Sequence, residues 1–241
     1  MADFIKKLKQ KRKPFVSAVV AAGGTGTRMG ENKLLMDLCG MPVLAHTLLA
    51  LEKCEMIDEI VISAHKDSVL EYSQLAKKYG IKKLKSVVTG GENRSISVFK
   101  GISAVSENCR FVAIHDGARP FITNEEIEKV ISKAFYTGAA TASVPVKDTI
   151  KQIADDKITA TIERATLVQV QTPQVFDIDL IKGALTKVIA EKISVTDDCQ
   201  AMEIMGFNPT VVTTSYDNIK ITTPEDILFG QLILNKRGAQ K

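Results

Sequence analysis

The sequence predicts an α/β domain with a mostly parallel β-sheet that helices cover on both faces. Three observations lead to this expectation. Short apolar runs alternate with segments of about 10–15 residues that have helical spacing. The first apolar run, residues 16–22, ends in a glycine loop, and polar clusters follow several later runs. A chain of 241 residues is also long enough to bury a large core without disulfides or a metal.

The elements follow in chain order from these patterns. Strands are expected at residues 16–22, 57–63, 85–88, 111–114, 139–146 and 210–213. Helices are expected from Pro42 to about Lys53, over 67–79 before Gly80, over 95–106, after the capping-box spacing of Thr123 and Glu126, over 177–190 and 197–205, and from Thr223 onward. Strands joined through helices imply right-handed crossovers in a single domain over residues 15–241.

Residues 148–172 interrupt this alternation. They are rich in Thr, Val and Ile, Asp155 and Asp156 indicate a turn, and residues 157–162 alternate with period two. This pattern predicts an inserted β-hairpin rather than another strand–helix unit. A hairpin inserted late in such a domain often packs on a partner, so we expect it to form an arm.

The net positive charge of the chain comes from residues 1–14. This basic extension carries six Lys or Arg and one Asp, while the whole chain carries a net charge of +4. The remaining body lacks the basicity of a nucleic-acid-binding domain. No apolar run approaches the roughly 20 residues that span a bilayer, and no secretory signal is evident. The four cysteines are widely scattered, so we expect free thiols and a cytoplasmic location.

The glycine loop after the first strand is a candidate anion site. Gly23, Gly24 and Gly26 free the backbone to direct N–H groups at an anion, and Arg28 and Lys33 supply positive charge. The loop lacks the third glycine of a dinucleotide fingerprint and the Gly-Lys-Ser/Thr of an ATPase loop. It therefore favours a phosphate or nucleotide site of another kind.

Three polar clusters follow later strands, and ligands in open α/β sheets bind beyond the carboxyl ends of the strands. The clusters span residues 90–97, 115–120 and 217–220. If they meet the glycine loop, one rim carries Arg28, Lys33, Arg94, Arg119 and Lys220 together with Asp116 and Asp217. Many cations with a few carboxylates suit a phosphate-rich ligand that carries Mg²⁺. His115 beside Asp116 favours a structural hydrogen-bonding role over that of a general base.

At this point the chain resembles the nucleotidyltransferases of the nucleotide-diphospho-sugar transferase fold. The glycine loop followed by Lys33 is shared by many of them. More specific motifs resemble the 2-C-methyl-D-erythritol 4-phosphate cytidylyltransferase (IspD) family: residues 115–121, 145–149, 171–174, 196–198 and 217–226. The resemblance runs from about residue 16 to 235 and implies a Rossmann-like three-layer fold. The loop is one residue longer than in some members, and Asn32 stands where many have proline.

The resemblance implies transfer of CMP from CTP to 2-C-methyl-D-erythritol 4-phosphate. The products would be 4-diphosphocytidyl-2-C-methyl-D-erythritol and pyrophosphate, in the non-mevalonate isoprenoid pathway. It also implies a homodimer formed through the hairpin arm. Mg²⁺ is the implied cofactor, held mainly by CTP phosphates with Asp116 and Asp217 as candidate neighbours.

The resemblance also implies roles for individual residues. Those expected in catalysis are Arg28, Lys33, Arg164 and Lys220. Those expected to bind CTP are Ala21, Ala22, Gly23, Gly24, Gly26, Thr27, Gly91, Glu92, Ser97, Asp116 and Gly117. Those expected to bind the acceptor phosphate are Asp116, Arg119, Thr149, Arg164, Thr172 and Lys220, with Thr149 and Arg164 acting on the second subunit.

Other functions are compatible with parts of this pattern. Ribitol 5-phosphate cytidylyltransferase shares the fold and the CTP site, and only the acceptor pocket separates the two enzymes. A purine-specific nucleotidyltransferase is a more distant alternative. A regulatory subunit that binds nucleotide without catalysis would not need Arg28, Lys33 and Lys220 together.

Overall fold

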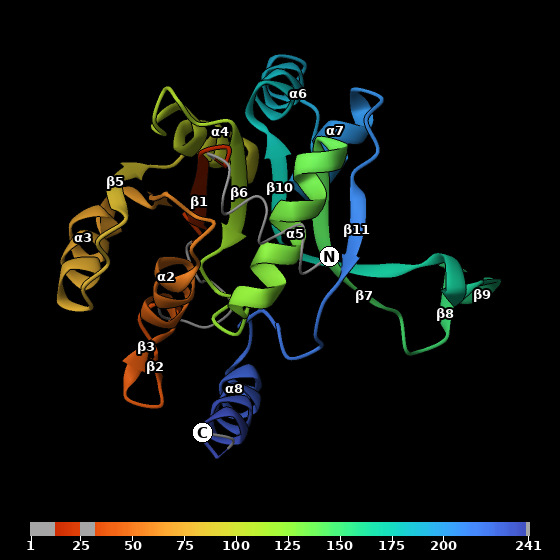
Figure 1. Ribbon diagram of the computed structural model, residues 1–241. Helices are drawn as coiled ribbons and strands as arrows, with labels where there is room; N and C mark the ends of the chain where they lie inside the picture. The colour runs from red at the N-terminus through yellow and green to blue at the C-terminus, as the bar shows by residue number, and fades with distance from the viewer. Residues whose placement is uncertain (1–12, 25–31, 240–241) are drawn as a thin grey trace.

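The computed structural model describes residues 13–24 and 32–239. These residues form a seven-stranded sheet in the order β11-β7-β10-β6-β1-β4-β5 (Figure 1). Its strands are β1 Val16–Ala22, β4 Glu59–Ala64, β5 Leu84–Thr89, β6 Phe111–Asp116, β7 Ala139–Pro145, β10 Val168–Asp177 and β11 Thr210–Thr213. Its pairings are parallel except those of β10, which is antiparallel to both β6 and β7. The expectation of a mostly parallel α/β sheet is confirmed.

Helices cover both faces of the sheet and complete three layers (Figure 1). They are α2 Val43–Lys53, α3 Val69–Lys78, α4 Arg94–Ser103, α5 Asn124–Thr137, α6 Ile178–Ala190, α7 Asp198–Ile204 and α8 Pro224–Gly238, with short 3₁₀ turns η1 Lys66–Ser68 and η2 Arg164–Thr166. Helices α2, α3 and α5 share one hydrophobic core, which includes Leu48 and Tyr72. Helices α4, α6 and α7 share the other, which includes Ile102 and Leu185. No helix in the described ranges is long and apolar enough to cross a membrane.

Strand β1 lies inside the sheet between β4 and β6, which explains the apolar run at residues 16–22. Six of its seven residues are buried, because neighbouring strands flank it and helices cover both faces. Val19 belongs to one core and Val20 to the other, as the alternation of a strand requires. After Ala22 the chain leaves the sheet in the glycine loop, at the edge where the parallel strands β4, β5 and β6 also end.

Two predicted helix ends are confirmed. The Thr123 hydroxyl accepts a hydrogen bond from the Glu126 N–H, and the Glu126 carboxylate accepts one from the Thr123 N–H, so α5 begins with a capping box. Gly80 follows α3 with φ of +69°, a left-handed conformation that favours glycine. Local sequence signals therefore position two helices correctly before any packing is considered.

The inserted hairpin is shorter than the 148–172 range expected. Its strands are β8 Ile150–Ala154 and β9 Lys157–Ile162, and together they project from the body of the molecule (Figure 1). Residues 168–172 instead begin β10, an antiparallel strand of the main sheet. Period-two spacing is the same in a hairpin and in a sheet strand, so it does not mark where the arm ends. A further small hairpin pairs β2 Asp37–Leu38 with β3 Met41–Pro42.

Candidate functional site

Two pockets adjoin near the end of β1 and β6. The first pocket, of about 420 Å³, lies among the glycine loop, residues 91–94 and the start of α4. The second pocket, of about 490 Å³, lies between β10 and the start of α7. Arg94, Asp116 and Lys220 line both pockets and form the wall between them.

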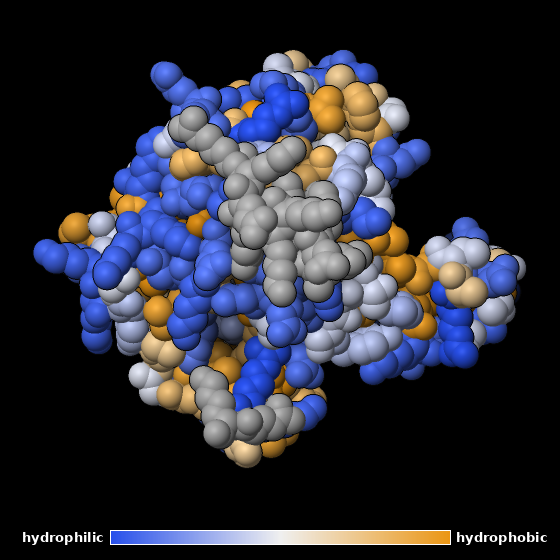
Figure 2. Space-filling view, in the orientation of Figure 1, coloured by the Kyte–Doolittle hydropathy of each residue, from blue (hydrophilic) through white to orange (hydrophobic). Residues whose placement is uncertain are grey.

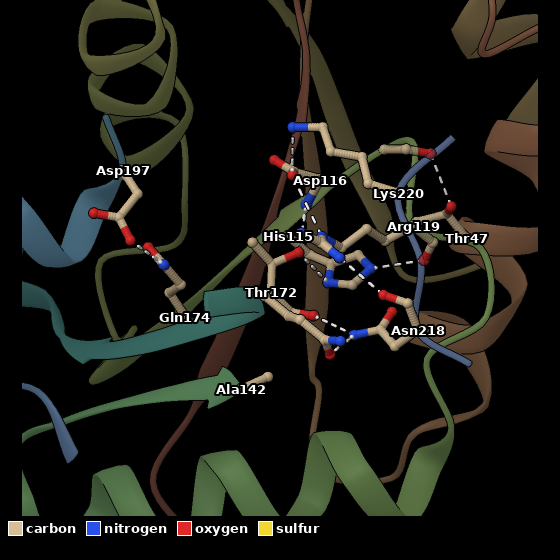
Figure 3. Close-up of polar contacts among 12 residues, drawn as sticks. Thr47, His115, Asp116, Arg119, Ala142, Thr172, Gln174, Asp197, Asn218 and Lys220 are labelled. Atoms are coloured by element: carbon tan, nitrogen blue, oxygen red, sulfur yellow. Dashed lines mark hydrogen bonds and ion pairs between the residues drawn. The ribbon is translucent and has the colours of Figure 1, made fainter. Parts of the chain in front are cut away.

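Asp116, the last residue of β6, is at the centre of this wall. Its Oδ1 lies 2.7 Å from Arg94 Nη1, and its Oδ2 lies 2.8 Å from Lys220 Nζ and 3.6 Å from Arg119 Nε. Figure 3 shows Lys220 and Arg119 converging on Asp116 from different segments of the chain. One carboxylate therefore holds three cations in fixed positions between the pockets.

The charges around Asp116 keep it ionised. Burial raises the pKa of this carboxyl, but Arg94 and Lys220 outweigh burial and hold the pKa well below its usual range. Burial likewise acts to lower the pKa of Arg94, and the carboxylates of Asp198 and Asp116 instead raise it. The wall thus carries permanent charges at neutral pH, as a site for anionic ligands requires.

Asp198 supports the wall from the side of α7. Its Oδ2 lies 2.7 Å from Arg94 Nη2, and its side chain is only 1% exposed. Arg94 therefore bridges two carboxylates, Asp116 on β6 and Asp198 on α7. This bridge ties the shared wall to the helix that lines the far side of the second pocket.

A buried hydrogen-bond network lies behind the wall (Figure 3). The Asp116 N–H donates to the Thr172 hydroxyl at 3.0 Å, and the same hydroxyl lies 3.0 Å from His115 Nδ1. The side-chain amide of Asn218 donates to the Thr172 carbonyl at 2.9 Å. The backbone carbonyl of Asn218 accepts from the Arg119 guanidinium at 2.8 Å. Burial lowers the pKa of His115 to about 4, so the imidazole is neutral at pH 7. Its surroundings agree with the structural role expected for this histidine.

Most of the predicted site residues line the two pockets. Those that line the first pocket are Ala21, Ala22, Gly23, Gly24, Lys33, Gly91, Glu92, Ser97, Asp116 and Lys220. Those that line the second pocket are Asp116, Arg119, Thr172 and Lys220. The fold thus brings together segments that lie almost 200 residues apart, Ala21 and Lys220 among them.

The conformation of the loop before α4 depends on Gly91 and Ser97. The Ser97 hydroxyl accepts from the Gly91 N–H at 3.0 Å and donates to the Asn93 carbonyl at 2.8 Å. A Cβ atom at Gly91 would clash with Cγ2 of Ile96. Gly91 and Ser97 therefore hold the backbone that borders the first pocket.

Several predicted residues do not line either pocket. Gly26, Thr27 and Arg28 lie outside the described residues. Gly117 is buried, and its N–H donates to the Ala21 carbonyl at 3.0 Å, so its expected contact with CTP stays a prediction. Asp217 faces Arg237 at 3.8 Å and lines a separate depression near the start of α5. Asp217 was expected to join Asp116, but it lines neither of the two pockets, and the next residue, Asn218, is instead buried behind the wall, where it donates to Gln171 and Thr172.

Thr149 and Arg164 lie on the hairpin side of the molecule. Both are exposed, and Arg164 Nη1 donates to the Lys147 carbonyl at 2.6 Å. Neither residue is among those that line the first or the second pocket. Their expected part in binding the acceptor phosphate on a second subunit stays a prediction.

The far wall of the second pocket was not identified from the sequence. Gln174 Nε2 donates to Asp197 Oδ2 at 2.7 Å, and the Gln174 Oε1 accepts from the Asp198 N–H at 3.1 Å. Asp197 also accepts from the Gln200 N–H and caps α7. The Thr196-Asp197-Asp198 motif was visible, but the inward turn of Asp198 toward Arg94 depends on the packing of α7 against α6.

The described residues contain no group of three or more His, Cys, Asp or Glu side chains able to hold a metal ion. Asp116 is the carboxylate common to both pockets, and three cations already surround it. A divalent cation therefore fits here only together with an anionic ligand that supplies most of its oxygen atoms.

Comparisons with known proteins show the family to which the chain belongs. The family model described as "IspD: 2-C-methyl-D-erythritol 4-phosphate cytidylyltransferase" matches residues 16–236. The enzyme of that name from Halalkalibacterium halodurans is 45% identical over 223 residues, which cover 92% of this chain and 97% of the relative. Its counterpart from Alkaliphilus metalliredigens is 44% identical over 226 residues, which cover 92% and 94%. The crystal structure of 4-diphosphocytidyl-2C-methyl-D-erythritol synthase from Anaerococcus prevotii has a TM-score of 0.83 at 35% identity, covering 92% of this chain and 96% of that one. The chain therefore belongs to the 2-C-methyl-D-erythritol 4-phosphate cytidylyltransferase family of nucleotidyltransferases.

Proposed function

We propose that the two pockets divide a cytidylyl transfer between them, with CTP in the first pocket and 2-C-methyl-D-erythritol 4-phosphate in the second. The acceptor follows from the family, whose reaction serves isoprenoid biosynthesis, and no observation favours ribitol 5-phosphate. One observation carries the division: Arg94, Asp116 and Lys220 line both pockets. Two phosphate-bearing substrates on either side of one charged wall meet with their reacting groups at that wall.

The first pocket has the components of a nucleotide site. Gly23 and Gly24 offer backbone near the end of β1, and Lys33 adds a cation for the triphosphate. Gly91 and Ser97 border the opposite side, where backbone groups suit the edge of a cytosine. The single hydroxyl proton of Ser97 is directed at the Asn93 carbonyl and one of its lone pairs takes the Gly91 N–H, so we propose that Ser97 shapes the base site mainly through the backbone. Arg28 remains a predicted second cation for the triphosphate.

The second pocket suits the acceptor phosphate. On the shared wall, the cations Arg94, Arg119 and Lys220 surround one carboxylate, Asp116, whereas the acidic residues Asp197 and Glu203 line the α7 side of the pocket. A phosphate that enters therefore meets positive charge already held in place, which lowers the cost of bringing two anions together. Arg119 and Lys220 line this pocket and are the proposed phosphate ligands.

The proposed reaction is an in-line displacement. An oxygen of the acceptor phosphate attacks the α-phosphorus of CTP, the new P–O bond forms, and the bond to the β-phosphate oxygen breaks as pyrophosphate leaves. Lys220 lies on the wall where this charge develops, and Asp116 holds its ammonium group in position. Mg²⁺, bound mainly by the CTP phosphates with Asp116 nearby, would neutralise part of their charge.

We propose that the chain acts as a homodimer through the inserted hairpin. Ile153 and Ile158 are 65% and 66% exposed on this hairpin, which projects from the body at the right of Figure 2, so a second subunit that covered it would bury apolar surface. In such a dimer, Thr149 and Arg164 would reach the second pocket of the other subunit. This arrangement would give the arm of each chain a part in its partner's acceptor site.

We also propose a cytoplasmic location. The four cysteines are free thiols, three of them buried. Burial raises the pKa of Cys54, Cys109 and Cys199, so these thiols stay protonated and unreactive. Free thiols without disulfides support a reducing compartment.

A pyrophosphate-release assay with CTP tests the proposed function. The acceptor panel is 2-C-methyl-D-erythritol 4-phosphate, ribitol 5-phosphate and no acceptor, each with Mg²⁺ and again with a chelator. We expect rapid release only with methylerythritol phosphate and Mg²⁺. Equal release with ribitol phosphate, or release without an acceptor, would contradict the proposal.

A further inference from the structure

The network behind the second pocket contains a buried histidine that the proposed reaction does not use. His115 is 0% exposed and directly precedes Asp116 on β6. Its Nε2 lies 3.1 Å from the Arg119 carbonyl oxygen, and its Nδ1 lies 3.0 Å from the Thr172 hydroxyl oxygen (Figure 3). Both ring nitrogens therefore have one partner each, and both partners belong to residues that line the second pocket.

The chemistry of these partners determines the direction of each hydrogen bond. A carbonyl oxygen only accepts, so Nε2 carries the proton and donates to Arg119. In a neutral imidazole the other nitrogen then has a free lone pair, so Nδ1 accepts from the Thr172 hydroxyl. The Thr172 oxygen in turn accepts from the Asp116 N–H at 3.0 Å. The chain of donors runs from Asp116 through Thr172 and His115 to the Arg119 carbonyl.

We infer that His115 is a positioning residue for the acceptor site, because its Nδ1 lone pair fixes the Thr172 hydroxyl and, through that hydroxyl, the backbone of Asp116. This inference rests on the proposed function and names how its second pocket is built. The same imidazole also holds the Arg119 carbonyl, so it sets the spacing between Asp116 and Arg119. Without it, the ends of the loop from Asp116 to Arg119 lose a common anchor.

The direction of these hydrogen bonds determines whether the Thr172 hydroxyl can still donate to a substrate or only accept from it. Its single hydroxyl proton is directed at His115, and one of its two lone pairs takes the Asp116 N–H. One lone pair remains, which accepts hydrogen bonds and repels a phosphate oxygen. Thr172 therefore suits a hydroxyl group of the acceptor, whereas the phosphate belongs with Arg119 and Lys220. This refines the expectation that Thr172 binds the acceptor phosphate.

Matched variants separate positioning from simple stability. His115→Phe keeps a ring of similar size without ring nitrogens, and His115→Asn places an amide oxygen near the position of Nδ1. His46→Asn is the control, because His46 Nε2 also contacts a carbonyl oxygen, that of Leu38 at 2.7 Å, away from both pockets. The readouts are the acceptor KM and kcat from pyrophosphate release, and the CTP Kd from calorimetry.

We expect His115→Phe to raise the acceptor KM by about tenfold or more, because the Thr172 hydroxyl and the Arg119 carbonyl both lose a buried hydrogen-bond partner. The CTP Kd should change by less than about threefold, in keeping with His115 acting behind the second pocket. His115→Asn should recover most of the acceptor KM, and His46→Asn should leave both constants unchanged. Equal losses for both substrates in His115→Phe, or no recovery in His115→Asn, would overturn the inference.

Thr172→Val provides the second test if His115→Phe does not fold. It should show the same acceptor-selective defect, and combining it with His115→Asn should add little, because without the Thr172 hydroxyl the amide oxygen introduced at position 115 has no donor from which to accept. An unchanged acceptor KM in Thr172→Val contradicts the inference.

Long-range ¹H–¹⁵N spectra of histidine-labelled protein give a readout without activity. They should show the Nε2–H tautomer for His115 at pH 7, and an Nδ1–H tautomer or a doubly protonated ring would refute the inference. If the wild-type chain released no pyrophosphate with CTP and methylerythritol phosphate, the proposed function would fail while these spectra still decided the direction of the bonds.

Discussion

The buried, neutral state of His115 predicts how the stability of the protein depends on pH. Burial lowers the pKa of His115 from 6.5 to about 4 in the folded chain. Unfolding exposes the ring and restores the higher value, so between pH 6.5 and 4 the unfolded chain binds more protons than the folded chain. The free energy of unfolding must therefore fall as the pH falls through this window.

The size of this effect follows from the two pKa values. At pH 7 the folded ring is neutral and about three quarters of the unfolded rings are neutral, whereas at pH 5 the unfolded ring is almost fully protonated and the folded ring is not. Linkage then gives a loss of about 2 kcal/mol between pH 7 and pH 5 from this one group. For a chain of this length, that loss corresponds to a fall in Tm of roughly 4–8 °C.

Urea unfolding at pH 7, 6 and 5 measures the effect. Wild-type protein and His115→Asn are compared, because carboxylates such as Asp198 titrate in both and cancel in the difference. We expect the wild type to lose about 2 kcal/mol more than His115→Asn over this range. Parallel pH profiles for the two proteins would refute the argument, since they would show that His115 is protonated to the same degree before and after unfolding.

Other variants test the pockets, the bridge and the arm. Lys33→Ala should lower turnover at least about tenfold, because Lys33 lines the first pocket; near-normal turnover removes its catalytic assignment. Arg164→Ala should raise the acceptor KM while leaving the CTP KM unchanged, and light scattering should show a dimer at micromolar concentration; a monomer, or an unchanged acceptor KM, counts against action across subunits. Asp198→Ala removes one partner of the buried Arg94 bridge and should cost about 3–5 kcal/mol in urea unfolding, whereas a cost below about 1 kcal/mol would mean that Asp116 alone is a sufficient partner for Arg94.

The fold was largely predictable because its signals are local. The buried run of β1, the capping box at Thr123 and the glycine after α3 each depend on neighbours within a few residues. The antiparallel strand β10 was not separated from the inserted hairpin, because its pairing partners β6 and β7 lie more than 20 residues earlier in the chain. Pairing with strands that are so distant in the chain does not alter the local sequence pattern.

The candidate site was predictable in its cations and less so in its carboxylates. Arg94, Arg119 and Lys220 meet at Asp116 as the positions of strand ends suggested. Asp217 was expected beside them on sequence proximity to Lys220, yet three residues are enough to turn the chain to another surface. Asp198 was missed for the opposite reason, since its place beside Arg94 depends on how α7 packs and not on any neighbour in sequence.

The turnover of Lys220→Met with CTP and methylerythritol phosphate, both at saturating concentration, tests the central claim most directly. Lys220 lines both pockets, and its Nζ lies 2.8 Å from the carboxylate at the centre of the shared wall. If reaction occurs at this wall, loss of the ammonium group should lower kcat by about 100- to 1,000-fold, equivalent to roughly 2.7–4 kcal/mol of transition-state stabilisation. A normal kcat with changes confined to the KM values would contradict the claim that the two substrates react at the wall that Arg94, Asp116 and Lys220 form.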